Sequence, residues 1–238
     1  MKLPERSSSL REGRDERLTL PPGSDRFLIG AALVSLVGYL ALLLFVRANP
    51  RPKADFNATI KLQRLQNRSL ARLMDSVSWF GFRPQSLLVP AASVLFFWFR
   101  GRRLASFFLT AAWASSLLSF FTKLVIRRPR PDDPRIRIVQ ADIRDTSFPS
   151  GHTLHYVTFW GFLAYLGATS VHNRRIGRVI ATLATAVIGL VGPSRVYLGH
   201  HWLTDVLASY LLGFAYLTGL VTVYRALRSI LELDDQTS

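Results

Sequence analysis

The residues of this chain that could do chemistry gather in three short polar stretches, each beside a long apolar run. The last of these, SRVYLGHHWLTD (194–205), holds an arginine, two adjacent histidines and an aspartate. If a helix begins near His200, then Asp205 lies one turn from His201 on the same face, and His200 points elsewhere. A carboxylate that accepts from one imidazole nitrogen fixes the tautomer and leaves the other nitrogen free to attack. We therefore expect His201 to be a nucleophile and His200 to face solvent or cap the helix.

A second stretch, FPSGH (148–152), stands directly before an apolar run. Gly151 permits close approach of the backbone, and the N–H groups and the Ser150 hydroxyl at a helix start can point at an anion. His152 follows at the helix start, where it could give or take a proton. We expect His155, one turn later, to be a packing residue or to lie at the lipid edge.

The third stretch, KLVIRRPRP (123–131), supplies positive charge. Lys123 and Arg130, together with Arg195 of the last stretch, offer N–H donors to an anion. Arginine forks match the oxygens of a phosphoryl group, and lysine adds a point charge. Alone, each stretch could be a cationic flank, a helix cap or a structural His–Asp hydrogen bond. At corresponding helix ends, they together indicate a site for phosphoryl transfer.

Six apolar runs predict how these stretches are brought together. A helix needs about 20 residues to cross the roughly 30 Å hydrocarbon core, or about 17 at the short end. Four runs have that length, and two reach it with flanking residues and snorkelling arginines. The runs are 27–46, 84–99, 104–122, 153–171, 179–194 and 206–224. A soluble protein would have to bury all of them. The sequence therefore predicts an all-α, polytopic membrane helix bundle with six transmembrane helices.

Charged tails flank the predicted membrane domain, which covers residues 27–224. Residues 1–26 mix charges without a pattern, so we expect a disordered cytoplasmic tail followed by a first helix that is not cleaved as a signal peptide. Residues 225–238 are expected to form a cytoplasmic C-terminal tail.

Six spans put the three polar stretches on one side of the membrane. The loops RGRR (100–103) and HNRRIGR (172–178), on the other side, each carry three arginines and no acidic residue. Short loops rich in Lys and Arg favour the cytoplasm. We therefore expect an extracytoplasmic site and cytoplasmic N- and C-termini.

The segment between the first and second spans is basic. Four of its cations recur at steps of three or four residues: Lys61, Arg64, Arg68 and Arg72. Apolar residues fall mostly on the opposite face, which predicts an amphipathic helix over 56–79 on the lipid surface. It could present anionic lipid to the site, or it could be only an anchor.

Composition excludes several classes of chemistry. The chain has no cysteine, which rules out disulfides, thiolate nucleophiles and cysteine–zinc sites. Its net charge of +15 could indicate nucleic acid, anionic lipid or cytoplasmic loops. In a chain with six spans we expect membrane lipids as partners and no nucleic acid.

Two metal sites remain open as alternatives. Asp132 and Asp133 could bind magnesium, although they follow PRP in a loop without acidic partners. A zinc site would use His152, His155, His200 and His201.

The three stretches, in this order, resemble the signature of the type 2 phosphatidic acid phosphatase superfamily, which includes lipid phosphate phosphatases and vanadium haloperoxidases. KLVIRRPRP fits K-x6-R-P, PSGH stands at 149–152, and SRVYLGHHWLTD fits S-R-x5-H-x3-D. The resemblance covers residues from about 55 to 224 and implies that no metal or other cofactor is needed.

The resemblance also implies a role for each residue. His201 would form a phosphohistidine and Asp205 would orient it. His152 would protonate the leaving oxygen and then activate water. The phosphoryl oxygens would be held by Lys123, Arg130, Ser150, Gly151 and Arg195.

The substrate implied is a lipid phosphate at a bacterial inner or plasma membrane. Undecaprenyl diphosphate stands slightly ahead of phosphatidylglycerol phosphate and phosphatidate. A lipid phosphotransferase using the same intermediate is the alternative enzyme, and a non-enzymatic phospholipid binder or transporter is the alternative from another class.

Overall fold

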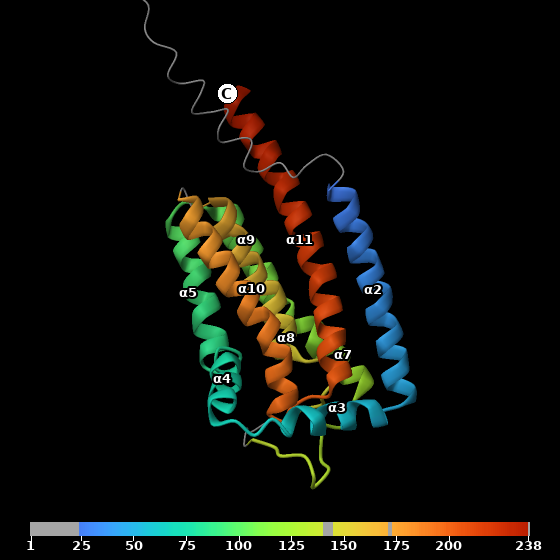
Figure 1. Ribbon diagram of the computed structural model, residues 1–238. Coiled ribbons are helices and arrows are strands. Elements are labelled where there is room, and N and C mark those ends of the chain that lie inside the picture. The colour runs from blue at the N-terminus through green and yellow to red at the C-terminus, as the bar shows by residue number, and fades with distance from the viewer. Residues whose placement is uncertain (1–23, 140–144, 171–172, 238) are drawn as a thin grey trace, which may run out of the picture.

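The computed structural model describes residues 24–139, 145–170 and 173–237, and every regular element in these ranges is a helix. The long helices run side by side as a bundle (Figure 1). In chain order the elements are α2 (Ser24–Ala48), α3 (Lys53–Gln63), α4 (Arg68–Trp79), α5 (Gln85–Phe99), α6 (Arg103–Ala114), α7 (Ser116–Ile126), α8 (Gly151–His155), the π-helical turn η1 (Tyr156–Trp160), α9 (Gly161–Ser170), α10 (Arg174–Tyr197) and α11 (Leu203–Thr237).

Four stretches are long and apolar enough to cross a membrane: 26–48, 103–126, 175–197 and 203–231. The other two predicted spans have a different form. α5 has 15 residues, or about 22 Å of helix, less than the roughly 30 Å hydrocarbon core. The run 153–171 is divided among α8, η1 and α9.

The π-helical turn η1 follows His155, in the part of this run nearest the polar stretches. There the buried hydroxyl of Thr158 donates to the carbonyls of Leu154 (3.0 Å) and Ala112 (3.1 Å). A hydroxyl that binds into the backbone ladder is a usual cause of such a distortion, and π-turns occur often at functional sites.

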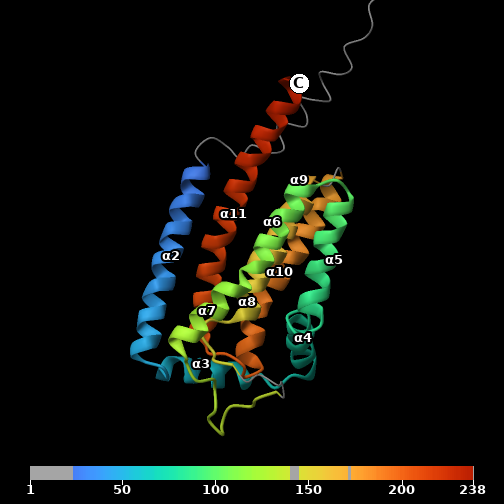
Figure 2. The ribbon, with the colours of Figure 1, turned by 180° about the vertical axis from the view of Figure 1, so that it is seen from behind.

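α11 packs along α2 and also contacts α6, α8, η1, α9 and α10 (Figure 2). The main apolar cluster lies between α6, η1, α9 and α11, where Phe108, Phe162 and Tyr224 pack ring against ring. This cluster fixes the helices whose ends carry the polar stretches.

Large apolar side chains also cover the outside of the bundle. The exposed fractions of Phe27, Val34 and Phe99 are 76%, 72% and 81%. An outer surface of this kind is unfavourable in water and favourable in contact with lipid chains.

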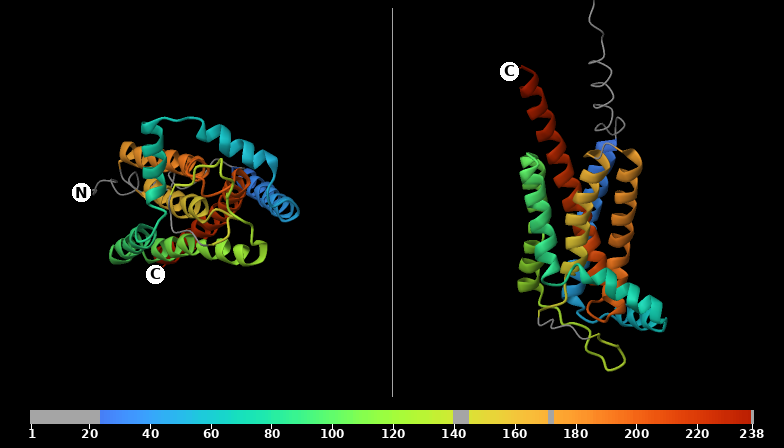
Figure 3. Two further views of the ribbon diagram at one scale, coloured as in Figure 1. Left: turned by 90° about the horizontal axis from the view of Figure 1, so that it is seen from below. Right: turned by 90° about the vertical axis from the view of Figure 1, so that its left-hand side faces the viewer.

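The single amphipathic helix expected over residues 56–79 is wrong, because the structure has two helices there, α3 and α4. Asn67 separates them: its side chain accepts from the N–H groups of Ser69 (2.8 Å) and Leu70 (3.2 Å) and caps the start of α4. Both helices lie at one end of the bundle (Figure 3).

α3 turns polar side chains toward the bundle: Asp55, Thr59 and Gln63 are buried. The amide of Gln63 donates to the carbonyls of Arg137 (2.7 Å) and Tyr197 (2.8 Å). α3 is therefore held by specific hydrogen bonds as well as by apolar contact.

The predicted tails fall at the limits of the described residues. Residues 1–23 of the N-terminal tail lie outside them, and α2 begins at Ser24. The segment predicted as a C-terminal tail continues α11 as helix to Thr237.

Candidate active site

The predicted site residues lie at the end of the bundle where α3 crosses it (Figure 1). α7 and α10 end there, and α8 and α11 begin there, so each contributes a polar terminus. The residues placed at this end are Lys123, Arg130, Ser150, Gly151, His152, Arg195, His201 and Asp205.

His201 presents its two ring nitrogens to different groups. Nδ1 donates to the carbonyl of Ser147 (2.8 Å), and Oδ2 of Asp205 lies 3.5 Å from the same nitrogen. Because a carbonyl can only accept, the proton sits on Nδ1 and Nε2 has a free lone pair. Nε2 lies 3.3 Å from Nη1 of Arg130. Burial, together with the cations of Arg130 and Arg195, lowers the pKa of His201 well below its ordinary value.

The sequence suggested Asp205 as an acceptor for His201, and it did not identify the carbonyl of Ser147. Asp205 is fully buried and is itself held by other donors. Arg128 donates to Oδ1 (2.5 Å), and the backbone N–H of Trp202 donates to Oδ2 (2.8 Å). Every residue has a backbone carbonyl, so residue types cannot indicate which carbonyl accepts from His201, and only the fold could identify it.

Asp145 is a second feature that the sequence did not identify. Its carboxylate accepts from Nζ of Lys123 and from Nη2 of Arg130. The backbone carbonyl of Asp145 also accepts from Nε of Arg130 (2.8 Å). Burial raises the pKa of Asp145, but Lys123 and Arg130 outweigh it and lower the pKa below its ordinary value. A carboxylate anion is therefore bound to Lys123 and Arg130, the two cations that the resemblance assigned to phosphate binding.

His152 and Arg195 carry buried nitrogens that have no hydrogen-bond partner within the described part of the chain. These atoms are Nε2 of His152 and Nε and Nη2 of Arg195. Nη1 of Arg195 donates to the hydroxyl of Ser78 on α4 (3.2 Å). Buried donors without an acceptor are costly, and a bound anion would satisfy them.

The turn between α4 and α5 packs against both groups. The ring of Phe82 lies edge-on to His152, with centroids 4.7 Å apart, and the guanidinium of Arg195 lies 5.0 Å from the same ring centre. A Cβ at Gly81 would lie 2.1 Å from Cδ2 of His152. The sequence alone did not identify this Gly–Phe pair as part of the site.

Ser150 caps α8. Its hydroxyl oxygen accepts from the N–H of Thr153 (3.4 Å), and the two hydroxyls are 3.0 Å apart. A Cβ at Gly151 would lie 3.4 Å from Oγ of Ser119, an ordinary contact. The helix start that holds His152 is thus fixed by local hydrogen bonds.

His200 is buried, so the expectation that it faces solvent or caps a helix is wrong. Its Nε2 donates to the carbonyl of Val139 (2.7 Å) and ties down the loop that precedes the FPSGH stretch. Gly199, with φ +72°, makes the turn that directs it there. Burial and the charge of Arg195 lower the pKa of His200 to about 4. His155 stacks on Phe159, with centroids 5.3 Å apart.

A cavity of about 280 Å³ opens beside these groups. Its lining combines the turn before α5, the end of α7 and the start of α8. The charged residues and histidines that line it are Arg83, Lys123, Asp145, His152 and His155.

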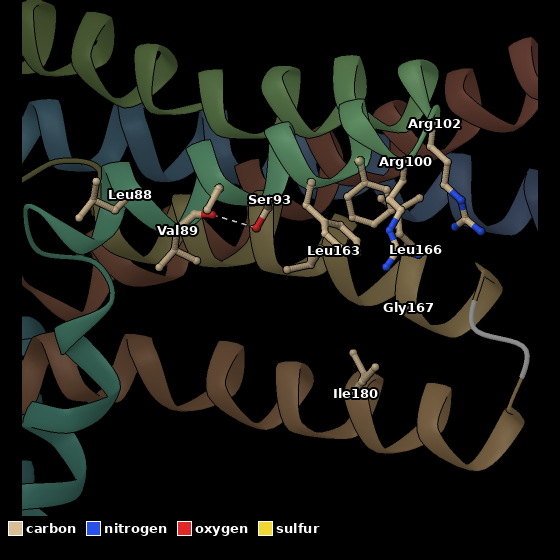
Figure 4. Close-up of a pocket in the computed structure, with 12 residues that line it drawn as sticks. Leu88, Val89, Ser93, Arg100, Arg102, Leu163, Leu166, Gly167 and Ile180 are labelled. Atoms are coloured by element: carbon tan, nitrogen blue, oxygen red, sulfur yellow. Dashed lines mark hydrogen bonds between the residues drawn. The ribbon is translucent and has the colours of Figure 1, made fainter.

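A larger cavity, of about 1070 Å³, runs along α5 from Leu88 to Arg102 and is bounded by α9 and α10 (Figure 4). Its walls are mostly apolar, for example Leu88 and Leu166, and its charged lining residues are Arg100 and Arg102. It contains no acid, histidine or other nucleophile apart from the Ser93 hydroxyl, which donates to the carbonyl of Val89 (2.8 Å). The smaller, polar cavity is the one lined by predicted site residues, namely Lys123, Gly151 and His152. Arg130, Arg195 and His201 are not among the residues that line it.

The two acids considered for magnesium lie apart from this cavity. Asp132 pairs with Arg51 (2.6 Å) and Asp133 with Arg135 (2.8 Å). Among the residues that the structure describes, no group of three or more His, Asp or Glu side chains is placed to hold a metal ion.

Comparison with known proteins identifies one family and two similar phosphatases. The model of a family described as the PAP2 superfamily matches residues 103–229. Phosphatidylglycerophosphatase B of Bacillus subtilis (strain 168) is 27% identical over 183 residues, which cover 74% of this chain and 85% of that protein. Lipid phosphate phosphatase delta of Arabidopsis thaliana is 27% identical over 162 residues, which cover 65% of this chain and 38% of that protein.

A solved structure shares the fold. It is the crystal structure of a transmembrane PAP2-type phosphatidylglycerolphosphate phosphatase from Bacillus subtilis, with a TM-score of 0.68 and 22% sequence identity. The match covers 81% of this chain and 94% of the other.

Proposed function

The chain belongs to the PAP2 superfamily, and we propose that it is an integral membrane phosphatase that hydrolyses the phosphate head groups of lipids. The observation that carries the proposal is the position of the neutral Nε2 of His201, 3.3 Å from Arg130. The unpaired buried donors of Arg195 and His152 lie at the same end of the bundle. A nucleophile, cations and a proton-transfer group are thus gathered where a phosphoryl group could bind.

In the proposed reaction, Nε2 of His201 attacks phosphorus, and the bond from phosphorus to the lipid oxygen breaks. His152 gives its proton to the leaving oxygen. His152 then takes a proton from water, which attacks the phosphohistidine and releases orthophosphate. The carbonyl of Ser147 and the carboxylate of Asp205 hold the Nδ1 proton while the ring carries positive charge.

Lys123, Arg130 and Arg195 would carry the charge of the transition state, with N–H groups at the start of α8 near Ser150 and Gly151. We propose that these cations take the role that a metal ion has in other phosphatases. Substrate phosphate would compete with the carboxylate of Asp145 for the N–H donors of Lys123 and Arg130.

We propose phosphatidylglycerol phosphate as the first substrate to test, because a curated relative and a solved structure with this fold are named as phosphatases of that lipid. Undecaprenyl diphosphate, which the sequence placed slightly ahead, and phosphatidate complete the panel.

We further propose six spans, formed by the four long apolar stretches, α5, and the α8–η1–α9 segment. This arrangement puts the site and the surface helices α3 and α4 on the extracytoplasmic side. It puts the arginine-rich loop 100–103 on the cytoplasmic side.

Release of orthophosphate from the lipid panel in detergent micelles tests the proposal, with His201→Ala as the inactive reference. We expect wild-type activity that survives a strong chelator. Wild-type protein that releases no more phosphate than His201→Ala would refute it. Label transferred from lipid to an added lipid or sugar alcohol instead of to water would favour the phosphotransferase.

A further inference from the structure

A buried cluster of charges joins α3 to the start of α11. Nη2 of Arg128 donates to Oδ2 of Asp55 (2.6 Å), and Nη1 donates to Oδ1 of Asp205 (2.5 Å). The exposed fraction of each of these side chains is at most 1%. Asp55 also accepts from the hydroxyl (2.6 Å) and the N–H (2.9 Å) of Thr204. Two buried carboxylates thus share one guanidinium.

Arg128 holds both groups that face Nδ1 of His201. Its side chain binds Asp205, whose other oxygen lies 3.5 Å from Nδ1. Its backbone carbonyl accepts from the N–H of Ser147 (2.9 Å), and the carbonyl of Ser147 accepts from Nδ1 (2.8 Å). A displacement of Arg128 would therefore disturb both acceptors at once.

Asp55 holds Arg128 on the side away from His201. It lies on α3, outside the residues 103–229 that match the family model and outside the three signature stretches. We propose that Asp55 is a positioning residue for His201 that acts through Arg128 and Asp205. This inference rests on the proposed function.

The cluster affects the negative charge on Asp205 as well as the position of its carboxylate. Attack by Nε2 makes the ring of His201 cationic, and negative charge on Asp205 stabilises that ring through Nδ1–H. A guanidinium bound to Asp205 alone would neutralise it. Asp55 takes part of the interaction with Arg128 and leaves more negative charge on Asp205. Removal of the charge on Asp55 should slow attack and leave the phosphate-binding cations in place.

Asp55→Asn tests this, because it removes the charge and keeps the size and one acceptor oxygen. The matched control is Asp132→Asn, since Asp132 also pairs with an arginine at 2.6 Å. That pair lies on the surface, with exposed fractions of 57% for Arg51 and 59% for Asp132. For each full-length protein in micelles, we would measure phosphoenzyme formation in a single turnover, inhibition by orthophosphate, and the thermal midpoint.

We expect Asp55→Asn to form phosphoenzyme about 10- to 100-fold more slowly, as when an outer partner of a functional histidine is lost. Its inhibition constant for orthophosphate should stay within about twofold of wild type, because ground-state binding is unchanged. Asp132→Asn should match wild type in every measurement. A folded Asp55→Asn protein that reacts at the wild-type rate would overturn the proposal. Equal losses of rate and orthophosphate affinity would also overturn it and leave Asp55 as an anchor of the fold.

If Asp55→Asn does not fold, Thr204→Val tests whether the contact between Asp55 and Arg128 affects His201. It removes the hydroxyl that Asp55 and Arg128 both bind. We expect phosphoenzyme formation to slow by about threefold or more, the equivalent of one hydrogen bond, and the wild-type rate would overturn the proposal. Wild-type protein without phosphatase activity would contradict the proposed function instead, so the two failures are distinguishable.

Discussion

The close packing of Gly81 against His152 makes Gly81→Ala an informative perturbation. An added Cβ would lie 2.1 Å from Cδ2 of His152 and 2.8 Å from Nε2. Gly81 is not among the residues with positive φ, so alanine introduces no backbone strain there. The whole effect of the substitution must therefore come from contact with the imidazole ring.

The size of the effect follows from the overlap. Ordinary contact begins at 3.4 Å, so the ring of His152 or the turn must move by about 1.3 Å. Phe82 covers the ring, with centroids 4.7 Å apart, and limits that movement. A misplacement of about 1 Å in a reacting group can cost about 100-fold in rate. We expect kcat on a lipid monophosphate to fall by about that factor, or about 2.7 kcal/mol in the barrier.

The assay compares two substrates, because His152 is assigned to protonate the leaving group. A lipid alkoxide needs that proton, whereas an activated aryl phosphate needs little help. In Gly81→Ala, phosphoenzyme formation from the aryl phosphate should therefore stay within about threefold of wild type. Gly30→Ala is the control, because no atom lies within 4 Å of its added Cβ. Equal losses with both substrates, or a lipid phosphatase rate within about twofold of wild type, would refute the reasoning.

Three other predictions follow from the described geometry. Asp145→Asn should make orthophosphate inhibit about threefold to tenfold more tightly, because phosphate no longer competes with a half-exposed carboxylate for two cations; weaker inhibition would mean that Asp145 organises the cations. The pKa of His200 is lowered from 6.5 to about 4, so the unfolded chain binds a proton that the folded protein excludes. The thermal midpoint should therefore fall as pH drops from 6.5 to 4, and it should fall less in His200→Gln. An equal fall in the two proteins would show that His200 does not contribute to this pH dependence. Because the chain has no cysteine, Asp132→Cys and Arg175→Cys can be labelled singly on intact cells; an impermeant thiol reagent should label the first only, and the reverse pattern would invert the topology.

The sequence could predict the relative positions of residues that share one local pattern. Spacing alone placed Asp205 one turn from His201, and the cationic stretch pointed to phosphate. Asp55, Asp145 and Ser147 could not be found in this way. Each acquires its position through contact with a segment distant in the chain, as Asp55 does with Arg128, 73 residues away.

The two errors at the level of the fold have different origins. The periodic cations of residues 61–72 suggested one helix, but the local hydrogen bonds of Asn67 begin a second one. His200 was expected at the surface, yet it is buried and its Nε2 donates to the carbonyl of Val139, 61 residues away. The first error therefore comes from a local N-cap signal that was overlooked. Only the second comes from a tertiary contact, which overrides what the pattern of a single segment indicates.

The proposed mechanism is tested most directly by isolating the phosphoenzyme. His152→Ala protein, given an activated aryl phosphate, should accumulate an intermediate that is stable in alkali and labile in acid, because the base that activates water is missing. Peptide mapping should place the label on His201, and His201→Ala protein should accumulate none. Label on His200, or on a serine of the His201→Ala protein, would contradict the assignment of the nucleophile.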